Sequence, residues 1–123
     1  MLLKLSNGQI LQCYQSDNPA YGEGCDSVEG YCLFNADGSY EDGGEFDFDS
    51  NQIKTYEELY NKLIATMINP NLTYEVVAPT SDCQYEDFKE LLEEEFDEDM
   101  LDDIKGYFPN EKVQNLIREI KGD

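Results

Sequence analysis

The sequence predicts an α+β fold, in which a small antiparallel β-sheet from the N-terminal half packs with three or four α-helices mostly from the C-terminal half. Three observations lead to this prediction. A hairpin signal stands at Asn7-Gly8, the stretch "GEFDFD" alternates apolar and polar residues, and apolar stripes with helical spacing recur in the second half. We expect one compact domain over 1–123, β-rich in 1–50 and helical with one strand in 51–123.

The N-terminal half contains the strand and turn signals. Asn-Gly at the centre of "LLKLSNGQILQCY" predicts a β-hairpin, because both residues accept positive φ. Turn-forming residues dominate from Gln15 to Gly30, so we expect a loop there. Next, "YCLF" predicts a strand, "NADGS" a turn, and "GEFDFD" a strand with Phe46 and Phe48 on one face.

The first predicted helix lies near 56–68. Thr55 and Glu58 form a capping-box pattern at its start, and apolar residues follow at intervals of three and four. Asn69 and Pro70 should end this helix. The run "LTYEVVA" then predicts one more strand.

Two helices are expected in the acidic region that follows. The first lies near 84–95, and the second lies near 98–105, between a cap at Asp97 and a stop at Gly106. The predicted inner face of this region consists of Phe88, Leu91, Leu92 and Phe96.

The last predicted helix covers 111–121. Asn110 can cap its start and Gly122 can end it. A stripe of four apolar side chains gives the helix its buried face: Val113, Leu116, Ile117 and Ile120.

The composition argues against an enzyme. The chain of 123 residues has 28 acidic and 8 basic residues, a net charge of −20 and no histidine. Without histidine, His-based acid–base chemistry, Ser–His and Cys–His nucleophiles and His-ligated metals are excluded. Paired carboxylates that hydrolyse glycosides are the remaining catalytic alternative, but among so many acids the sequence singles out no pair.

The cysteines predict reduced thiols and no metal. Cys13, Cys25, Cys32 and Cys83 contain no C-x-x-C pair, so we expect no zinc site. Cys25 and Cys32 could close a small loop if oxidised. No apolar run is long enough to span a bilayer and no signal peptide is evident, so we expect a cytoplasmic protein without membrane contact.

A calcium-loop pattern is incomplete in this chain. Asp47, Asp49, Asn51 and Glu58 fall at positions 1, 3, 5 and 12, but Gln52 occupies position 6, which requires glycine. We therefore expect neither a metal nor another cofactor.

The charge is concentrated in two blocks. Ten acids and no base lie between Asp17 and Asp49, and eleven acids against the single base Lys89 lie between Glu86 and Asp103. If the second block were one continuous helix, it would span roughly 27 Å and carry about one net charge per 2.7 Å. Duplex DNA carries one per about 1.7 Å, so this surface could imitate a nucleic-acid backbone.

In overall charge and length the chain resembles the small acidic DNA-mimic inhibitors carried by phages and mobile elements, such as antirestriction and anti-CRISPR proteins. The resemblance implies a basic nucleic-acid-binding partner: a nuclease, CRISPR effector, restriction enzyme or repressor. Direct binding of nucleic acid is not expected, because Lys and Arg do not cluster.

The expected function is inhibition of such a partner by occupation of its basic groove. The alternative is an acidic protein–protein adaptor module with no link to nucleic acid. Plain solvation of the surface is a third interpretation. The candidate partner-binding residues are Glu86, Glu90, Glu93, Glu94, Asp97, Glu98, Asp99, Asp102, Asp103, Glu41, Asp42 and Glu45.

Overall fold

A computed structural model describes residues 1–17, 26–45, 56–79 and 83–122 and confirms the α+β fold. Its strands form an antiparallel five-stranded sheet in the order β4-β3-β2-β1-β5. The strands are β1 (Leu2–Leu5), β2 (Ile10–Asp17), β3 (Asp26–Phe34), β4 (Tyr40–Glu45) and β5 (Tyr74–Ala78). The helical elements are α1 (Tyr56–Leu63), the π-helical turn η3 (Ile64–Ile68), α2 (Phe88–Glu95), α3 (Glu98–Tyr107) and α4 (Glu111–Lys121).

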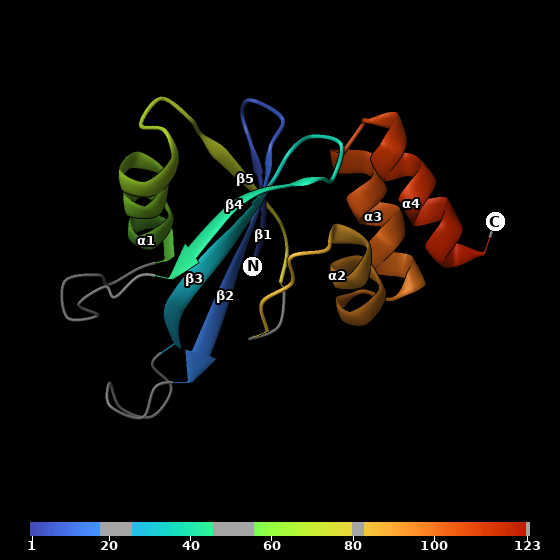
Figure 1. The fold of residues 1–123 in the computed structure, drawn as a ribbon, viewed down its shortest axis with the longest axis horizontal. Helices are drawn as coiled ribbons and strands as arrows, with labels where there is room; N and C mark the ends of the chain where they lie inside the picture. Colours follow the sequence, from blue (N-terminus) through green and yellow to red (C-terminus); the bar gives the residue numbers. More distant parts are fainter. Residues whose placement is uncertain (18–25, 46–55, 80–82, 123) are drawn as a thin grey trace.

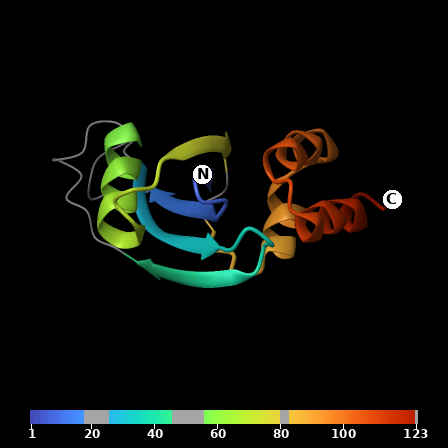
Figure 2. The same cartoon turned by 90° about the horizontal axis from the view of Figure 1, so that it is seen from above.

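The elements form three layers. Figures 1 and 2 show the curved sheet in the middle, with α1 on one side and α2, α3 and α4 on the other. Side chains alternate between the two faces of a strand, so an apolar strand contributes buried side chains to the core on each side of the sheet. Leu3, Leu11 and Leu33 pack with the α1 side, whereas Ile10 and Phe34 pack with the three C-terminal helices.

The predicted hairpin at Asn7-Gly8 is confirmed, although only Gly8 has a positive φ, of 92°. The N–H of Gly8 donates to the carbonyl of Leu5 at 2.9 Å, and the N–H of Leu5 donates to the carbonyl of Gln9 at 2.9 Å. The side chain of Asn7 accepts from the N–H of Gln9 at 2.9 Å. The loop is therefore longer than the two-residue turn in which both central residues take positive φ.

The predicted "NADGS" turn has the same conformation. Gly38 has a φ of 88°, and its N–H donates to the carbonyl of Asn35 at 2.9 Å. The N–H of Asn35 donates to the carbonyl of Ser39 at 2.7 Å, and Asp37 accepts from the N–H of Ser39 at 2.9 Å. In both loops the residue before the glycine, Asn7 or Asp37, stabilises the turn by accepting a hydrogen bond from the N–H two residues later.

The loop expected from Gln15 to Gly30 is wrong at both of its ends. β2 continues to Asp17, and β3 already begins at Asp26. Gly30 is accommodated in β3 because the ring of Tyr14 covers it. β4 also lies earlier than "GEFDFD" predicts, since it starts at Tyr40, while Phe46 and Phe48 lie outside the described residues.

The helical region predicted near 56–68 is confirmed, but its last five residues form a π-helix. There the N–H of Asn69 donates to the carbonyl of Ile64 at 2.8 Å, and Asn69 itself is extended. Asn69 therefore ends the helix as predicted. Thr55 lies outside the described residues, and so does the predicted capping box.

α2 begins at Phe88, four residues later than the predicted start at 84. Asp87 caps it by accepting from the N–H of Lys89 at 2.9 Å. The residues before it are bound to the sheet by the fully buried side chain of Gln12, which donates to the carbonyl of Cys83 at 2.9 Å and accepts from the N–H of Tyr85 at 3.3 Å. These long-range bonds hold that segment extended, outside the helix.

α3 begins as predicted, because the side chain of Asp97 accepts from the N–H of Met100 at 2.9 Å. The predicted stop at Gly106 is wrong, since α3 includes Gly106 and ends at Tyr107. The side chain of Gln114, in α4, donates to the carbonyls of Lys105 and Phe108 at 2.8 and 2.7 Å. A residue of the next helix thus satisfies the end of α3, which needs no glycine there.

α4 matches its predicted bounds. Asn110 accepts from the N–H of Lys112 at 2.9 Å, and Gly122 closes the helix in the left-handed region with a φ of 79°. Val113 and Ile117 are fully buried, and Leu116 and Ile120 pack at the margin of the core.

Candidate partner-binding surface: the acids of β4, α2 and α3

The candidate acids are exposed wherever the structure describes their side chains. We call this set the acidic surface: Glu41 and Asp42 of β4, Glu86, Glu90, Glu93 and Glu94 in and before α2, and Asp97, Glu98, Asp99, Asp102 and Asp103 in and before α3. Glu45 ends β4, and its side chain lies outside the described residues.

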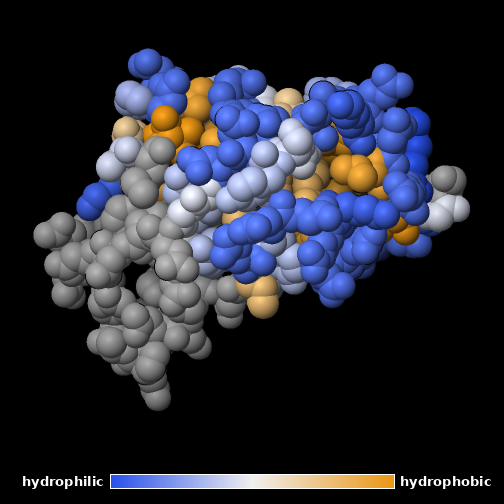
Figure 3. Space-filling model, in the orientation of Figure 1, coloured by the Kyte–Doolittle hydropathy of each residue, from blue (hydrophilic) through white to orange (hydrophobic). Residues whose placement is uncertain are grey.

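The orientation of the helices explains this exposure. The four apolar residues predicted to face inward are all buried, with exposed fractions between 0 and 7%: Phe88, Leu91, Leu92 and Phe96. Glu90, Glu93 and Glu94 consequently project from the opposite side of α2. The hydropathy view shows mainly hydrophilic residues over the helical end of the molecule, with hydrophobic side chains visible between them (Figure 3).

The second acidic block does not form one continuous helix. Phe96 leaves helical geometry, with φ −127° and ψ 137°, and Asp97 stays extended before α3 begins. The break between the two predicted helices is thus present, and the span of roughly 27 Å calculated for one continuous helix does not apply. The charge is instead distributed over two helices, both packed against α4.

Some acids in this block are held by basic residues. Lys89 donates to Glu119 of α4 at 3.0 Å and lies 3.8 Å from Glu93. The hydrogen bond and charge of Glu119 raise the pKa of Lys89, as do the charges of Glu93 and Asp87. Lys121 forms an ion pair with Asp102. These contacts link α4 to both acidic helices.

Other acids have structural roles. Asp87 and Asp97 are the N-caps of α2 and α3. Glu95 accepts a hydrogen bond from the hydroxyl of Tyr85 at 2.7 Å. Asp97 thus has a local function that accounts for its position without a partner.

The side-chain carboxylates of five acids in the two helices have no hydrogen-bond or ion-pair partner among the described residues: Glu90, Glu94, Glu98, Asp99 and Asp103. Glu90, Glu98 and Asp99 lie in the first turns of α2 and α3, where the helix dipole stabilises a carboxylate. Glu94 and Asp103 have no such local role, and exposed carboxylates that remain uncompensated repel one another. The five acids are the part of the acidic surface most available to a basic partner.

Tyr40 connects the strand of the first acidic block to the start of α2. Its ring lies 6.2 Å from that of Phe34, which in turn lies 5.2 Å from that of Phe88 at the start of α2. Partial burial raises the pKa of Tyr40, and the negative charges of Cys32, Glu86 and Asp42 would raise it further. Asp42 itself lies on the other face of the sheet, since its cross-strand partner Leu33 packs on the α1 side.

The cysteines provide no site in the described part of the chain. Cys13 and Cys32 are fully buried, Cys83 is exposed, and none of the three is in a disulfide. Cys25 lies outside the described residues.

No metal site is present in 1–17, 26–45, 56–79 and 83–122, where no three potential ligands gather. Asp47, Asp49 and Asn51 of the calcium-loop pattern lie outside these ranges. Likewise, none of the described helices is long and apolar enough to cross a membrane.

The periodicity of the sequence identified which acids are exposed but missed the residues that organise them. Gln12, Tyr85 and Glu119 come from outside the acidic helices or from their flanks, and their contacts span 10 to 73 positions of sequence. Gln12 stands between Leu11 and Cys13 and fits the apolar–polar alternation of a half-exposed strand, so the local pattern does not indicate that its side chain is buried. Comparison with known protein families, with curated proteins and with solved structures finds no match.

Proposed function

We propose that the protein is a nucleic-acid mimic that inhibits a DNA- or RNA-binding protein by occupying its basic groove. The acidic surface would stand in for the phosphate backbone. The partner would be a nuclease, CRISPR effector, restriction enzyme or repressor, and the inhibitor would work without catalysis or a cofactor.

The observation that carries this proposal is the placement of the two acidic blocks. Tyr40, at the start of the edge strand β4, contacts Phe34, and Phe34 contacts Phe88 at the start of α2. Uncompensated acids then continue along α2 and α3. A basic groove that follows a nucleic-acid backbone needs such an extended series of negative groups.

Electrostatics would mainly set the rate of encounter. A net charge of −20 attracts a basic groove over distances of the order of the Debye length, about 10 Å at 0.1 M salt. Single exposed ion pairs contribute only about 0–1 kcal/mol, so affinity would come from many contacts. Binding should therefore weaken steeply as the salt concentration rises.

The first test is identification of the partner. Immobilised protein is exposed to host lysate at low salt, and the bound proteins are eluted by raised salt and identified. A nucleic-acid-binding protein supports the proposal. A basic protein with no link to nucleic acid supports the adaptor alternative and overturns it.

The second test compares two variants of equal charge. Glu94→Lys with Asp103→Lys reverses one uncompensated acid in each acidic helix. Glu58→Lys with Glu75→Lys makes the same change in net charge on α1 and β5, outside the acidic surface. In displacement of labelled nucleic acid from the partner, the first variant should lose about tenfold in affinity relative to the second. Equal loss in both would mean that only net charge matters.

A further inference from the structure

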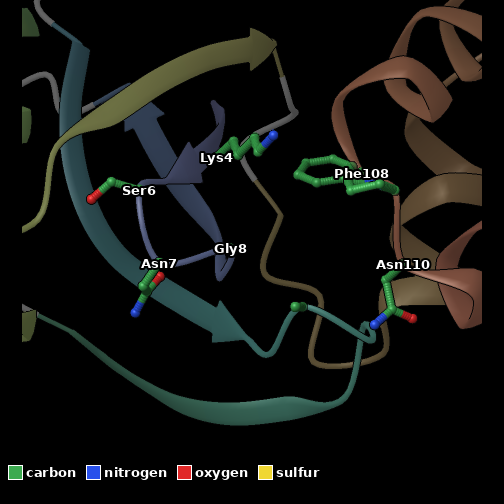
Figure 4. Close-up of a pocket in the computed structure, with 8 residues that line it drawn as sticks. Lys4, Ser6, Asn7, Gly8, Phe108 and Asn110 are labelled. Atoms are coloured by element: carbon green, nitrogen blue, oxygen red, sulfur yellow. The ribbon is translucent and has the colours of Figure 1, made fainter.

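We propose that a cavity between the sheet and the helical layer binds a small organic carboxylate with an aromatic or aliphatic body. The Lys4 cavity, as we call it, has a volume of about 510 Å³ (Figure 4). Small-molecule sites commonly measure about 300–1,000 Å³. Its lining comes from β1, both glycine turns and the α3–α4 connection, and it includes Lys4, Gly8, Ala36, Phe108, Pro109 and Asn110.

The described lining carries a positive charge, that of Lys4, whereas the chain as a whole is strongly negative. None of the lining residues in the described part of the chain is a carboxylate, although the chain has 28 acids. Lys4 is half-buried and has no ion pair or hydrogen bond among the described residues, even though Glu75 stands opposite it in the β1–β5 register. Figure 4 shows its side chain extending toward Phe108. An ammonium group without an acidic partner, on a half-buried lysine at the wall of a cavity, favours an anionic ligand group.

The remaining polar side chains of the lining are those of Ser6, Asn7 and Asn110. The hydroxyl oxygen of Ser6 already accepts from the N–H of Thr73 at 3.0 Å, which leaves the hydroxyl hydrogen to donate. The amide oxygen of Asn110 already accepts from the N–H of Lys112 at 2.9 Å, which leaves its NH₂ group to donate. Both ends of the Asn7 amide are engaged by Gln9, at 2.7 and 2.9 Å. A ligand here must therefore supply acceptor atoms, as a carboxylate does.

The other walls are apolar. Phe108, Pro109 and Ala36 border the cavity, and the ring of Phe108 is part of the core. A hydrocarbon or aromatic body would bury its surface against these side chains while its carboxylate meets Lys4. An inorganic anion would leave this apolar part of the cavity unused.

The walls are held in place before any ligand binds. Each glycine turn is closed by two backbone hydrogen bonds. The two turns contact each other. The side-chain nitrogen Nε2 of Gln9 donates to Oδ1 of Asn35 at 3.5 Å, and a Cβ at Gly8 would lie 3.6 Å from the Cβ of Ala36. On the opposite wall, Gln114 fixes the carbonyl of Phe108. Such preorganisation reduces the entropic cost of binding.

The experiment is an NMR titration of the full chain with benzoate and hexanoate at millimolar concentration. Benzamide, which has the shape of benzoate without its charge, is the matched control ligand. Benzoate should shift the amide signals of Gly8, Ala36 and Asn110, and benzamide should bind about tenfold more weakly. The proposal is overturned if benzoate leaves these signals unchanged or if benzamide binds equally well.

Two lysine variants test the role of the ammonium group. Lys4→Gln should weaken benzoate binding about tenfold. Lys105→Gln is the control, because Lys105 is also half-buried without an ion pair in the described residues but does not line the cavity. Equal affinity in the two variants would overturn the assignment to Lys4. Should Lys4→Gln fail to fold, the comparison of benzoate with benzamide still decides the question.

Discussion

The phenol ring of Tyr14 lies directly over Gly30, its cross-strand partner in β3. A Cβ atom at Gly30 would come within 2.1 Å of the Tyr14 hydroxyl and 2.5 Å of the carbonyl oxygen of Gly44. Gly44 differs, because a Cβ there would lie 3.5 Å from the ring of its partner Tyr31, an ordinary contact distance. Gly30 is therefore required for the space that it leaves to the ring of Tyr14 and to the backbone of Gly44.

We expect Gly30→Ala to destabilise the protein by about 1–3 kcal/mol or more, because the added methyl group must displace a buried ring and backbone atoms. Chemical denaturation followed by circular dichroism measures the change.

Gly106→Ala is the matched control. A Cβ at Gly106 meets nothing within 4 Å, and the residue lies inside α3. Alanine should stabilise a helical site by up to about 0.5–1 kcal/mol. The same sign of effect in both variants would contradict the packing argument, and destabilisation at Gly106 would contradict its place in the helix.

The buried amide of Gln12 gives the second prediction. Gln12→Met keeps the shape of the side chain but leaves the Cys83 carbonyl and the Tyr85 N–H without their partner. We expect a loss of about 1–3 kcal/mol, together with faster hydrogen exchange at the Tyr85 amide. Unchanged exchange at Tyr85 would show that Gln12 does not hold the segment before α2.

The third prediction concerns alkaline pH. Burial raises the pKa of the Cys13 thiol to about 12, although the N-terminal ammonium opposes part of this effect. The folded state therefore keeps a proton that the unfolded chain loses above about pH 8.5. Stability should fall between about pH 8.5 and 12, and Cys13→Ala should show a slope shallower by up to about 1.4 kcal/mol per pH unit. Parallel curves for the two proteins over this range would refute the assignment.

Much of the fold could be predicted where the signals are local. α4 has its cap at Asn110, its apolar stripe and its terminal glycine within 13 residues, and its bounds match. The errors occur where distant residues override a local signal. Gly106 does not end α3 because Gln114 satisfies the helix end, and Gly30 does not break β3 because Tyr14 covers it.

For the acidic surface, too, local signals were predictive and contacts between distant residues were not. Helical periodicity correctly predicted that Glu90 and Glu94 are exposed. It could not separate Asp102, which Lys121 neutralises, from Asp103, which has no partner in the described chain. That distinction depends on how α4 packs against α3, which the sequence pattern of either helix does not contain.

The fourth prediction uses this distinction to test whether the acids are kept for a partner. Neutralising two uncompensated acids, by Glu94→Gln with Asp103→Asn, removes repulsion and should raise the melting temperature at low salt. Neutralising two paired acids, by Glu119→Gln with Asp102→Asn, changes the net charge equally but removes the contacts to Lys89 and Lys121. This second variant should gain less or melt at a lower temperature.

Salt provides the check on this comparison. At about 1 M salt the Debye length falls to about 3 Å, so the repulsion between exposed acids is screened. The gain from Glu94→Gln with Asp103→Asn should then disappear, and wild type itself should melt at a higher temperature than in low salt. If the uncompensated acids instead stabilise the fold, their neutralisation will lower the melting temperature at low salt. In that case a structural role would explain their presence, and the need for a basic partner would lose its main support.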